Sequence, residues 1–595
     1  MKKKVVKSGQ LKKRRTPLRV VRETREKVGE HFSERFVGRL QNVREVRLWV
    51  AEWALLVLVV FLLAIVQIIW YGESYEREAF VRGGDYSEAT LGKVNSMNPL
   101  YATTSSEKTL ARLLFANLVS PDVSGHIKGE LAKSVTMDDT GKIWTVVLRD
   151  GIRWSDGEAI TADDVIYTVG LISNTDAKTT ISADFSKAKI EKIDEKTVKF
   201  TLPSVYVDFA DTLEFPLVPE HVLKDVKPAL VYENDFSTNP VVSGPFVLNA
   251  VQVAGSPNVK SLQTIYLNKN EEYFGVKPTL NSFTLKTFET KGDIESALRN
   301  LDVTATAELD EGIEGLPSAI GYRASRINGG VFAFMNTGDG VLKEVKVRQA
   351  IRQMVNIDEI LGDNLSSLRI DYPFLPEQGE NLTNPELPVV DLAAAKTLLT
   401  NAGYSERADG KFVDGNNQVL SLKLAVPNRG NMRRVAEAFT NKLREFGIDA
   451  ILNVYDEEQG AADFFSTIVK PRDYDILFYE IDLGVSADPF VYYSSRQANE
   501  AGWNLSNYRN SLADDALLSG RTTTDMALRK AKYESFLKRW VEDVPAIALY
   551  QSTAGYYYNT SARIYTEDLR MTDALDRFAD VSHWATSRAT VKLAP

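Results

Sequence analysis

The sequence predicts a mixed α/β protein preceded by a single membrane-spanning helix. Two observations lead to this fold class. An uncharged apolar run lies near the N-terminus, and short apolar strands alternate with amphipathic helices over most of the remaining chain. Such alternation is typical of α/β architectures. The 595 residues are enough for several domain-sized units.

Residues 49–71 are predicted to form the membrane-spanning helix. An uncharged run from Trp53 to Tyr71 nearly crosses a hydrocarbon core of about 30 Å, at about 1.5 Å per residue. The aromatic residues at its two ends suit a membrane interface. Residues 1–48 carry 16 Lys and Arg against 5 Asp and Glu. The positive-inside rule therefore places this basic tail in the cytoplasm and residues 72–595 outside the cell membrane.

A cleaved signal peptide is the alternative for this segment. Its basic part would be about 50 residues long, its apolar part would be overlong, and no small-residue cleavage site follows Trp70. We therefore expect an uncleaved anchor that contacts membrane lipid through residues 49–71. The basic tail then lies beside the membrane, where anionic headgroups can bind it, and we expect no nucleic acid as a partner.

Residues 72–92 are polar and contain glycine, which predicts a linker. Beyond them, β-branched and apolar runs predict strands, and apolar residues at helical spacing predict helices. Thr161, with Asp164 three residues on, predicts a capped helix start, and Gly447 predicts a helix end. The main predicted strands are 142–149, 331–334, 450–454, 476–478 and 546–550, and the main predicted helices begin at 161, 347, 391, 435 and 528.

Composition and motifs argue against an enzyme. Cysteine is absent and the four histidines are scattered without metal-ligand spacing, so we expect no metal site. The phosphate-binding, dinucleotide-binding, zinc-protease and nucleophile-elbow motifs are also missing from the sequence. Acidic pairs are numerous and leave a glycosidase pair open, but no single pair stands out. We expect no catalytic residue and no cofactor.

A set of motifs runs in order from about residue 95 to residue 550 of this sequence. The strongest is Leu148-Arg149-Asp150-Gly151-Ile152-Arg153-Trp154-Ser155-Asp156-Gly157, continued by Thr161-Ala162-Asp163-Asp164-Val165. Others are Asn98-Pro99-Leu100, Ser243-Gly244-Pro245-Phe246, Val347-Arg348-Gln349-Ala350-Ile351 and Asn504-Leu505-Ser506-Asn507-Tyr508. Together they resemble the large solute-binding proteins of peptide, dipeptide and nickel ABC importers, the family 5 class.

The resemblance implies a two-lobe, periplasmic-binding-protein-like clamshell with an extra subdomain in the first lobe. Residues 93–289 would form lobe I with its subdomain, 290–548 would form lobe II, and 549–595 would return to lobe I. The ligand would lie between the lobes and be enclosed by hinge closure.

Tyr479 and Asp482 are the sharpest ligand-binding candidates. They follow the predicted strand 476–478, where a strand leaves for a loop. In peptide-binding members of the family, a W-x-x-D element here supplies an acid that pairs with the α-ammonium of the peptide. By this resemblance Tyr479 would stand for the aromatic residue and Asp482 for the acid, and a solvated loop acid is the alternative reading. A desolvated ammonium needs such a fixed anion.

Five further residues are candidates for the cleft because their types suit a peptide backbone. Ser243 and Gly244 lie on a first-lobe loop, Asn336 follows the strand 331–334, and Trp503 and Asn504 lie on a later loop.

The leading hypothesis is a solute-binding component of an ABC importer. Its partners would be an oligopeptide or similar small solute and the ABC permease subunits. A membrane-tethered peptide sensor or scaffold on the same fold is the alternative, because residues 1–48 are a long cytoplasmic tail with a stretch at 22–40 that allows an amphipathic helix. A surface peptidase or glycosidase is a third hypothesis, disfavoured by the missing nucleophile and histidine arrangement.

Overall fold

The computed structural model describes residues 47–592 except 75, 123–124, 182–184, 254–260, 363–367, 380, 457–463, 487 and 568. The predicted tail helix at 22–40 lies outside the described residues. The chain divides into two compact units, one formed by residues 1–79 with 588–595 and the other by residues 80–587.

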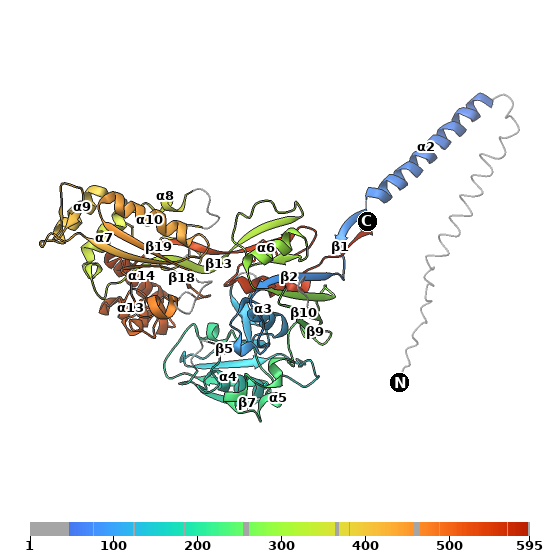
Figure 1. Cartoon of the computed structure of the whole chain (residues 1–595). Helices are drawn as coiled ribbons and strands as arrows, with labels where there is room; N and C mark the ends of the chain where they lie inside the picture. The colour runs from blue at the N-terminus through green and yellow to red at the C-terminus, as the bar shows by residue number, and fades with distance from the viewer. Residues whose placement is uncertain are drawn as a thin grey trace, which may run out of the picture. The chain divides into compact units, whose positions relative to one another are not determined.

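The first unit contains the helix α2 (Arg47–Ser74) and the strands β1 (Glu76–Phe80) and β20 (Arg588–Lys592), which pair with each other (Figure 1). The segment Trp49–Gln67 of α2 is long and apolar enough to cross a membrane. Its apolar side chains are exposed all round the helix, as expected for a helix that lies in lipid. The helix predicted at 49–71 is therefore present, and its membrane crossing stays a prediction.

The second unit is organised around one ten-stranded mixed sheet with strand order β17-β16-β18-β13-β19-β12-β2-β11-β10-β9. In chain order these strands are β2 (Asp85–Leu91), β9 (Phe246–Val253), β10 (Gln263–Lys269), β11 (Ser282–Phe288), β12 (Ala305–Thr306), β13 (Ile320–Met335), β16 (Ser421–Pro427), β17 (Asp449–Tyr455), β18 (Ile476–Asp482) and β19 (Ala546–Asn559). The strands predicted at 331–334, 450–454, 476–478 and 546–550 are all confirmed.

Buried hydrophobic side chains of the described residues divide this unit into two lobes. Two clusters draw on residues 86–309 and 556–584, and we call this part lobe I. Two others draw on residues 331–550, and we call that part lobe II. Residues 294–309 pack with the lobe I clusters. The predicted domain limits at 290 and 548 stay predictions.

The antiparallel pair β13 and β19 connects the two lobes (Figure 1). The first half of β13 pairs with the second half of β19 in lobe I, and the second half of β13 pairs with the first half of β19 in lobe II. The register shifts between Arg326 and Gly330. Two long strands that pass from one core to the other suit a hinge, because small φ/ψ changes there reorient whole lobes.

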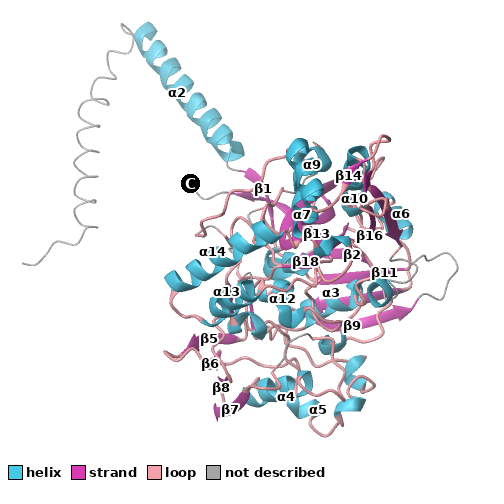
Figure 2. Cartoon of the chain, turned by 90° about the vertical axis from the view of Figure 1, so that its left-hand side faces the viewer, coloured by secondary structure: helices cyan, strands magenta, loops and turns pink. Residues whose placement is uncertain are grey.

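A separate four-stranded sheet with order β5-β6-β8-β7 forms a subdomain of lobe I (Figure 2). Its strands are β5 (Ala132–Met137), β6 (Ile143–Leu148), β7 (Lys189–Asp194) and β8 (Thr197–Thr201), covered by α4 (Ala162–Ile172). The predicted cap of α4 is confirmed, because Thr161 accepts from the Asp163 backbone while Asp164 accepts from the Thr161 backbone at 2.8 Å. Trp154 of the sequence motif is fully buried, as expected for a turn that packs on this sheet.

Helices cover the sheet in both lobes. They are α3 (Ser105–Leu114), α6 (Lys291–Arg299), α7 (Val345–Met354), α8 (Ile357–Leu361), α9 (Leu392–Asn401), α10 (Met432–Phe446), α12 (Phe490–Tyr493), α13 (Ser511–Thr522) and α14 (Met526–Asp543), with the 3-10 segments η3 (Phe209–Leu213) and η10 (Ala574–His583). The predicted helices beginning at 347, 391, 435 and 528 correspond to α7, α9, α10 and α14.

The predicted linker 72–92 differs from the structure along most of its length, because α2 extends to Ser74 and Glu76–Phe80 is strand β1. Asp85–Leu91 is strand β2 at the centre of lobe I, paired in parallel with β11 and β12. Its sequence does not predict a central strand, because it contains Asp and Glu. The glutamate, Glu88, is buried and forms an ion pair with Arg577, far along the chain.

Candidate functional site

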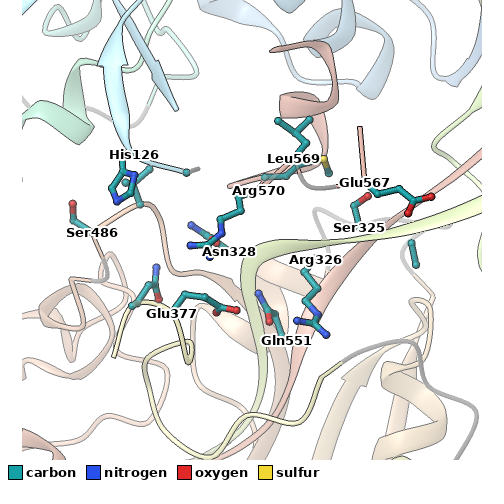
Figure 3. A pocket seen from close by; sticks show the side chains of 15 residues that line it. His126, Ser325, Arg326, Asn328, Glu377, Ser486, Gln551, Glu567, Leu569 and Arg570 are labelled. Carbon is teal, nitrogen blue, oxygen red and sulfur yellow. The ribbon is translucent and has the colours of Figure 1, made fainter. Parts of the chain in front are cut away.

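A cavity of about 510 Å³ lies where the two lobes meet (Figure 3). Its wall includes Arg326 and Gln551 from the crossing strands β13 and β19, Ser486 from a loop of lobe II, and Arg570 from the segment before η10. Cavities of this size, bounded by more than one folding unit, are the usual place for small ligands.

Asp482 is the last residue of β18 and pairs with Gly329 of the hinge strand β13. Its carboxyl accepts a hydrogen bond from the Gly484 backbone at 2.7 Å. Burial by the surrounding protein raises the pKa of Asp482, and the nearby Asp576 and Glu480 carboxyls raise it further. The side chain is nevertheless solvent-exposed.

Asp573 approaches the same region from lobe I. It caps η10 and accepts a hydrogen bond from the Leu575 backbone at 2.7 Å. Burial raises the pKa of Asp573 to about 6, with Asp576 and Asp482 contributing in the same direction. Asp573 is also solvent-exposed. Asp482 of lobe II and Asp573 of lobe I are therefore two exposed carboxyls whose electrostatic interaction raises the pKa of Asp573, although neither belongs to the described wall of the cavity. We call them the acidic pair.

Sequence reasoning missed Asp573. The only local signal was its capping box with Asp576, which marks a helix start and carries no information about a cleft. Tyr479, three positions before Asp482 on the same strand, points to the opposite face of β18 because side chains alternate along a strand. It packs partly buried against a lobe II core cluster, so the structure does not bring Tyr479 together with Asp482.

Ser243 and Gly244 lie in lobe I and contact the end of α3. The Ser243 hydroxyl accepts from the Ala116 backbone at 3.1 Å, and the Gly244 backbone donates to the Leu114 carbonyl at 2.7 Å. A Cβ at Gly244 would lie 2.5 Å from the Leu114 carbonyl carbon. Close backbone approach therefore explains this glycine, and binding of a ligand by these two residues stays a prediction.

Asn336, Trp503 and Asn504 are close together in lobe II, beyond the end of β13. The Asn336 amide donates to the Tyr474 carbonyl at 3.2 Å, and the buried Asn504 amide donates to the Ser494 carbonyl at 3.0 Å. Trp503 is 41% exposed. Neither they nor the pair at 243–244 belong to the described wall of the interlobe cavity. Both asparagines stabilise loops, and their contact with a ligand stays a prediction.

A second contact between the lobes lies at the subdomain. Asp208, just before η3 of lobe I, forms an ion pair of 2.5 Å with Arg529 of α14 in lobe II, and the two side chains are only 9% and 11% exposed. Nearby, the Arg521 guanidinium lies 4.3 Å from the Tyr206 ring centroid. The Ser486 backbone donates to the Asp211 carboxyl at 3.1 Å. We call these six residues the interlobe clamp, because they connect two lobes that are also joined by the hinge strands.

Arg529→Gln is expected to lower the free energy of unfolding by about 2–4 kcal/mol, because removing one member of a nearly buried pair leaves the Asp208 carboxylate desolvated without a partner. Urea denaturation of the full chain in mild detergent measures this. The matched control is Lys532→Gln on the same helix, whose pair with Asp515 is solvent-accessible and should contribute less than about 1 kcal/mol. Equal losses in the two variants would contradict a stabilising role for the clamp.

Comparison with known proteins agrees with this geometry. Residues 126–503 match the family model of bacterial extracellular solute-binding proteins, family 5 Middle. The oligopeptide-binding protein AppA of Bacillus subtilis is 24% identical over 81% of this chain and 91% of the relative. The solved structure of Bacillus subtilis AppA in complex with a nonapeptide covers 86% of this chain and 100% of its own, with 21% identity and a TM-score of 0.67.

A second solved structure shares the fold at a similar level. NikZ from Campylobacter jejuni, in complex with Ni(L-His), covers 84% of this chain and 99% of its own, with 22% identity and a TM-score of 0.68. The two-lobe fold predicted from the sequence is thereby confirmed. Because the family match extends over more than half of the chain, this protein belongs to the bacterial extracellular solute-binding proteins of family 5.

Proposed function

We propose that this protein is a membrane-anchored, extracytoplasmic solute-binding subunit of an ABC importer, and that it binds peptides through their free amino group. The observation that carries the ligand class is the acidic pair, in which Asp482 of lobe II interacts electrostatically with Asp573 of lobe I. The relatives support the class, since one is described as oligopeptide-binding and its solved structure holds a nonapeptide.

A cation bound between the two carboxyls of the acidic pair would favour closure of the cleft. Two nearby carboxylates repel each other, and the charge of Asp482 contributes in this way to the raised pKa of Asp573. An ammonium between them makes charge-assisted hydrogen bonds with each and removes the repulsion. A cation that contacts both lobes binds the closed arrangement better than the open one, so it shifts the population toward closure. The proposed role needs no covalent chemistry.

The helix α2 supplies the anchor in this proposal. A tethered binding protein stays at high local concentration near a permease in the same membrane. Alkaline extraction of cell membranes is the test of this part. The full-length protein should remain in the membrane pellet, and a soluble product that lacks the N-terminal segment would show that the helix is a cleaved signal instead.

Ligand binding is tested directly by native mass spectrometry of the full chain, purified gently in detergent, followed by calorimetry with trialanine. We expect either co-purified masses of short peptides or a binding isotherm with trialanine. A single bound mass that is not a peptide, together with no binding of any peptide from a mixed library, would contradict the peptide proposal and leave the family assignment intact.

Peptide affinity is expected to fall as the pH decreases through about 6. The pKa of Asp573 is raised to about 6, and Asp482 and Asp576 contribute to that shift. Only the ionised carboxylate pairs with an ammonium, while a peptide amino group, with a pKa near 8, stays mostly protonated over this range. Between pH 7.5 and pH 5 this one group should weaken binding by about tenfold. Calorimetry at both pH values measures it, and Asp573→Asn should remove most of the dependence.

A further inference from the structure

The interlobe clamp is centred on the turn between α13 and α14 of lobe II, which packs on residues 205–211 of lobe I. The Val207 backbone donates to the Arg521 carbonyl at 3.3 Å. A Cβ on Gly141, in the turn between β5 and β6, would lie 3.0 Å from the Thr524 Cγ2. The clamp therefore belongs to a continuous contact between the subdomain of lobe I and one helical turn region of lobe II.

Arg521 places a cation between aromatic rings of the two lobes. Its guanidinium lies 4.3 Å from the ring centroid of Tyr206 in lobe I and 4.9 Å from that of Phe490 in lobe II. Its Nε lies 2.9 Å from the Asp488 carboxylate. A cation gains more from an aromatic face when water is excluded. Separation of the lobes would remove the Tyr206 ring, so this contact favours the closed arrangement.

The ion pair of Asp208 with Arg529 acts in the same direction. The Arg529 guanidinium also lies 5.5 Å from the ring centroid of Tyr533, one turn later on the same helix, so its own lobe positions it for Asp208 of the other lobe. Attraction between opposite charges is stronger where water is largely excluded. The pair therefore stabilises the arrangement in which the two lobes touch.

Polar and charged groups dominate this contact, which suits an interface that opens and closes. Interfaces between folding units of one chain are more polar than permanent ones. When the lobes separate, water can hydrate the freed guanidinium and carboxylate groups, so opening does not leave buried charges without partners. Every contact described for the clamp is between protein groups, and none requires a ligand.

Ser486 connects the clamp to the interlobe cavity. It lies on the cavity wall (Figure 3), and its backbone donates to the Asp211 carboxyl of lobe I. A closed clamp therefore fixes this part of the wall against the opposite lobe, and the shape of the cavity depends on the clamp.

A rigid joint connects the clamp helix α14 to the hinge strands. Val544, between α14 and β19, has a φ of +47°, a costly conformation for a β-branched residue that persists where the surroundings fix it. Its backbone donates to the Trp540 carbonyl at 3.0 Å, and the Met335 backbone of β13 donates to the Pro545 carbonyl at 2.9 Å. A rotation of lobe II about the hinge therefore carries α14 with it and opens or closes the clamp.

We propose that the interlobe clamp is a latch that holds the two lobes closed through protein contacts alone, so that closure does not require a ligand. A solute bound in the cavity would then leave only after the latch opens. The latch includes neither Asp482 nor Asp573, and it operates without ligand, so it is independent of the proposed peptide binding.

Distances between two spin labels measure the equilibrium between closed and open lobes. The chain contains no cysteine, so labels can be attached through Ile193→Cys in the subdomain and Leu512→Cys in α13, both at exposed positions. Double electron–electron resonance of the full chain in detergent, shown by native mass spectrometry to carry no ligand, should give one short distance. Adding Arg529→Gln should populate a longer distance and lower the closed-to-open ratio by about 30-fold or more, since truncating one partner of a buried charge pair weakens an interface by this order.

Two further variants make the result specific to the latch. Asp208→Asn removes the partner from the other lobe and should give the same longer distance, which keeps the test decisive if Arg529→Gln does not fold. Lys532→Gln, whose pair with Asp515 is solvent-accessible, is the matched control and should keep the short distance. An open wild type without ligand, or short distances in both clamp variants, would overturn the latch and leave the proposed function intact. Failure to bind peptides by a chain that closes in this way would overturn the proposed function and leave the latch intact.

Discussion

Asp482→Asn is expected to weaken the binding of a free-amine peptide by about 100-fold or more, the largest effect on affinity that the cleft predicts. Removing one member of a desolvated charge pair typically costs 2–5 kcal/mol, because the other charge stays buried without its partner. In the variant the peptide ammonium would still be desolvated near Asp573, with one carboxylate to pair with instead of two. The amide of Asn keeps the volume of the side chain and its hydrogen bond from Gly484, so the loss reports on charge.

Two comparisons make this expectation specific. An N-acetylated peptide has no ammonium, so it should bind the wild type weakly and should not distinguish the wild type from Asp482→Asn. Asp473→Asn, which removes an exposed lobe II carboxylate paired with Lys423 at 2.7 Å, should leave the affinity unchanged. Calorimetry with the full chain at pH 7.5 gives all of these values. If Asp482→Asn binds the free-amine peptide like the wild type, the ammonium lies elsewhere.

The local elements were predictable because each signal lies within a few neighbouring residues. Thr161 and Asp164 are three positions apart and form the cap of α4 that their spacing predicts. Gly447 ends α10 with a φ of +106°, which the left-handed termination of a helix favours for glycine. Such features require only the chain on either side, so one sequence is enough to predict them.

Roles that depend on distant segments were not predictable in this way. The apolar pattern of α7 predicts that Arg348 lies on the solvent side of the helix, where an ion-pair partner is the usual interpretation. The structure buries it to 5% exposure, where it donates to the main-chain carbonyls of Asp543 and Leu342 at 2.7 Å each. The helix pattern identifies the face that meets the sheet, but it says nothing about the end of α14 that packs on the other side.

The candidate site likewise combines a residue that the local sequence predicts with a residue that depends on distant segments. Asp482 was found because it ends a recognisable strand within a family motif. Asp573 comes from a segment without such a motif, and that segment reaches β13 only because Met571 bridges to Ile327, far away in the sequence. Which charged residues reach a cleft depends on which strands cross there, and the local sequence does not contain that information.

The second large effect concerns stability and a fully buried ion pair. Arg577 of η10 contacts Glu88 of β2 at 2.5 Å, with side chains 4% and 0% exposed. The Tyr556 hydroxyl donates to the other oxygen of Glu88 at 2.7 Å and contacts the Tyr86 hydroxyl at 2.8 Å. Arg577→Met is expected to lower the free energy of unfolding by about 3–5 kcal/mol, because it leaves the Glu88 carboxylate buried without its partner. Urea denaturation of the full chain measures the loss.

The double variant Glu88→Gln/Arg577→Met separates the cost of an unpaired charge from the loss of packing. It removes the stranded charge, keeps an acceptor for Tyr556, and should recover most of the stability lost in Arg577→Met, since a neutral replacement of a buried pair is often close to neutral in stability. A double variant no more stable than Arg577→Met would show that the loss comes from packing around the arginine.

This network also connects stability to ligand binding, because Arg577 and Asp573 belong to the same segment. A state in which η10 detaches from β2 would lose the buried pair and one member of the acidic pair together. Ligand binds only the attached state. Trialanine at 100 times its Kd should therefore raise the free energy of unfolding of both Arg577→Met and the wild type by about 2.7 kcal/mol. The same increment in Asp482→Asn at that trialanine concentration would mean that the peptide does not use the acidic pair, whereas its absence would mean that the peptide binds through Asp482.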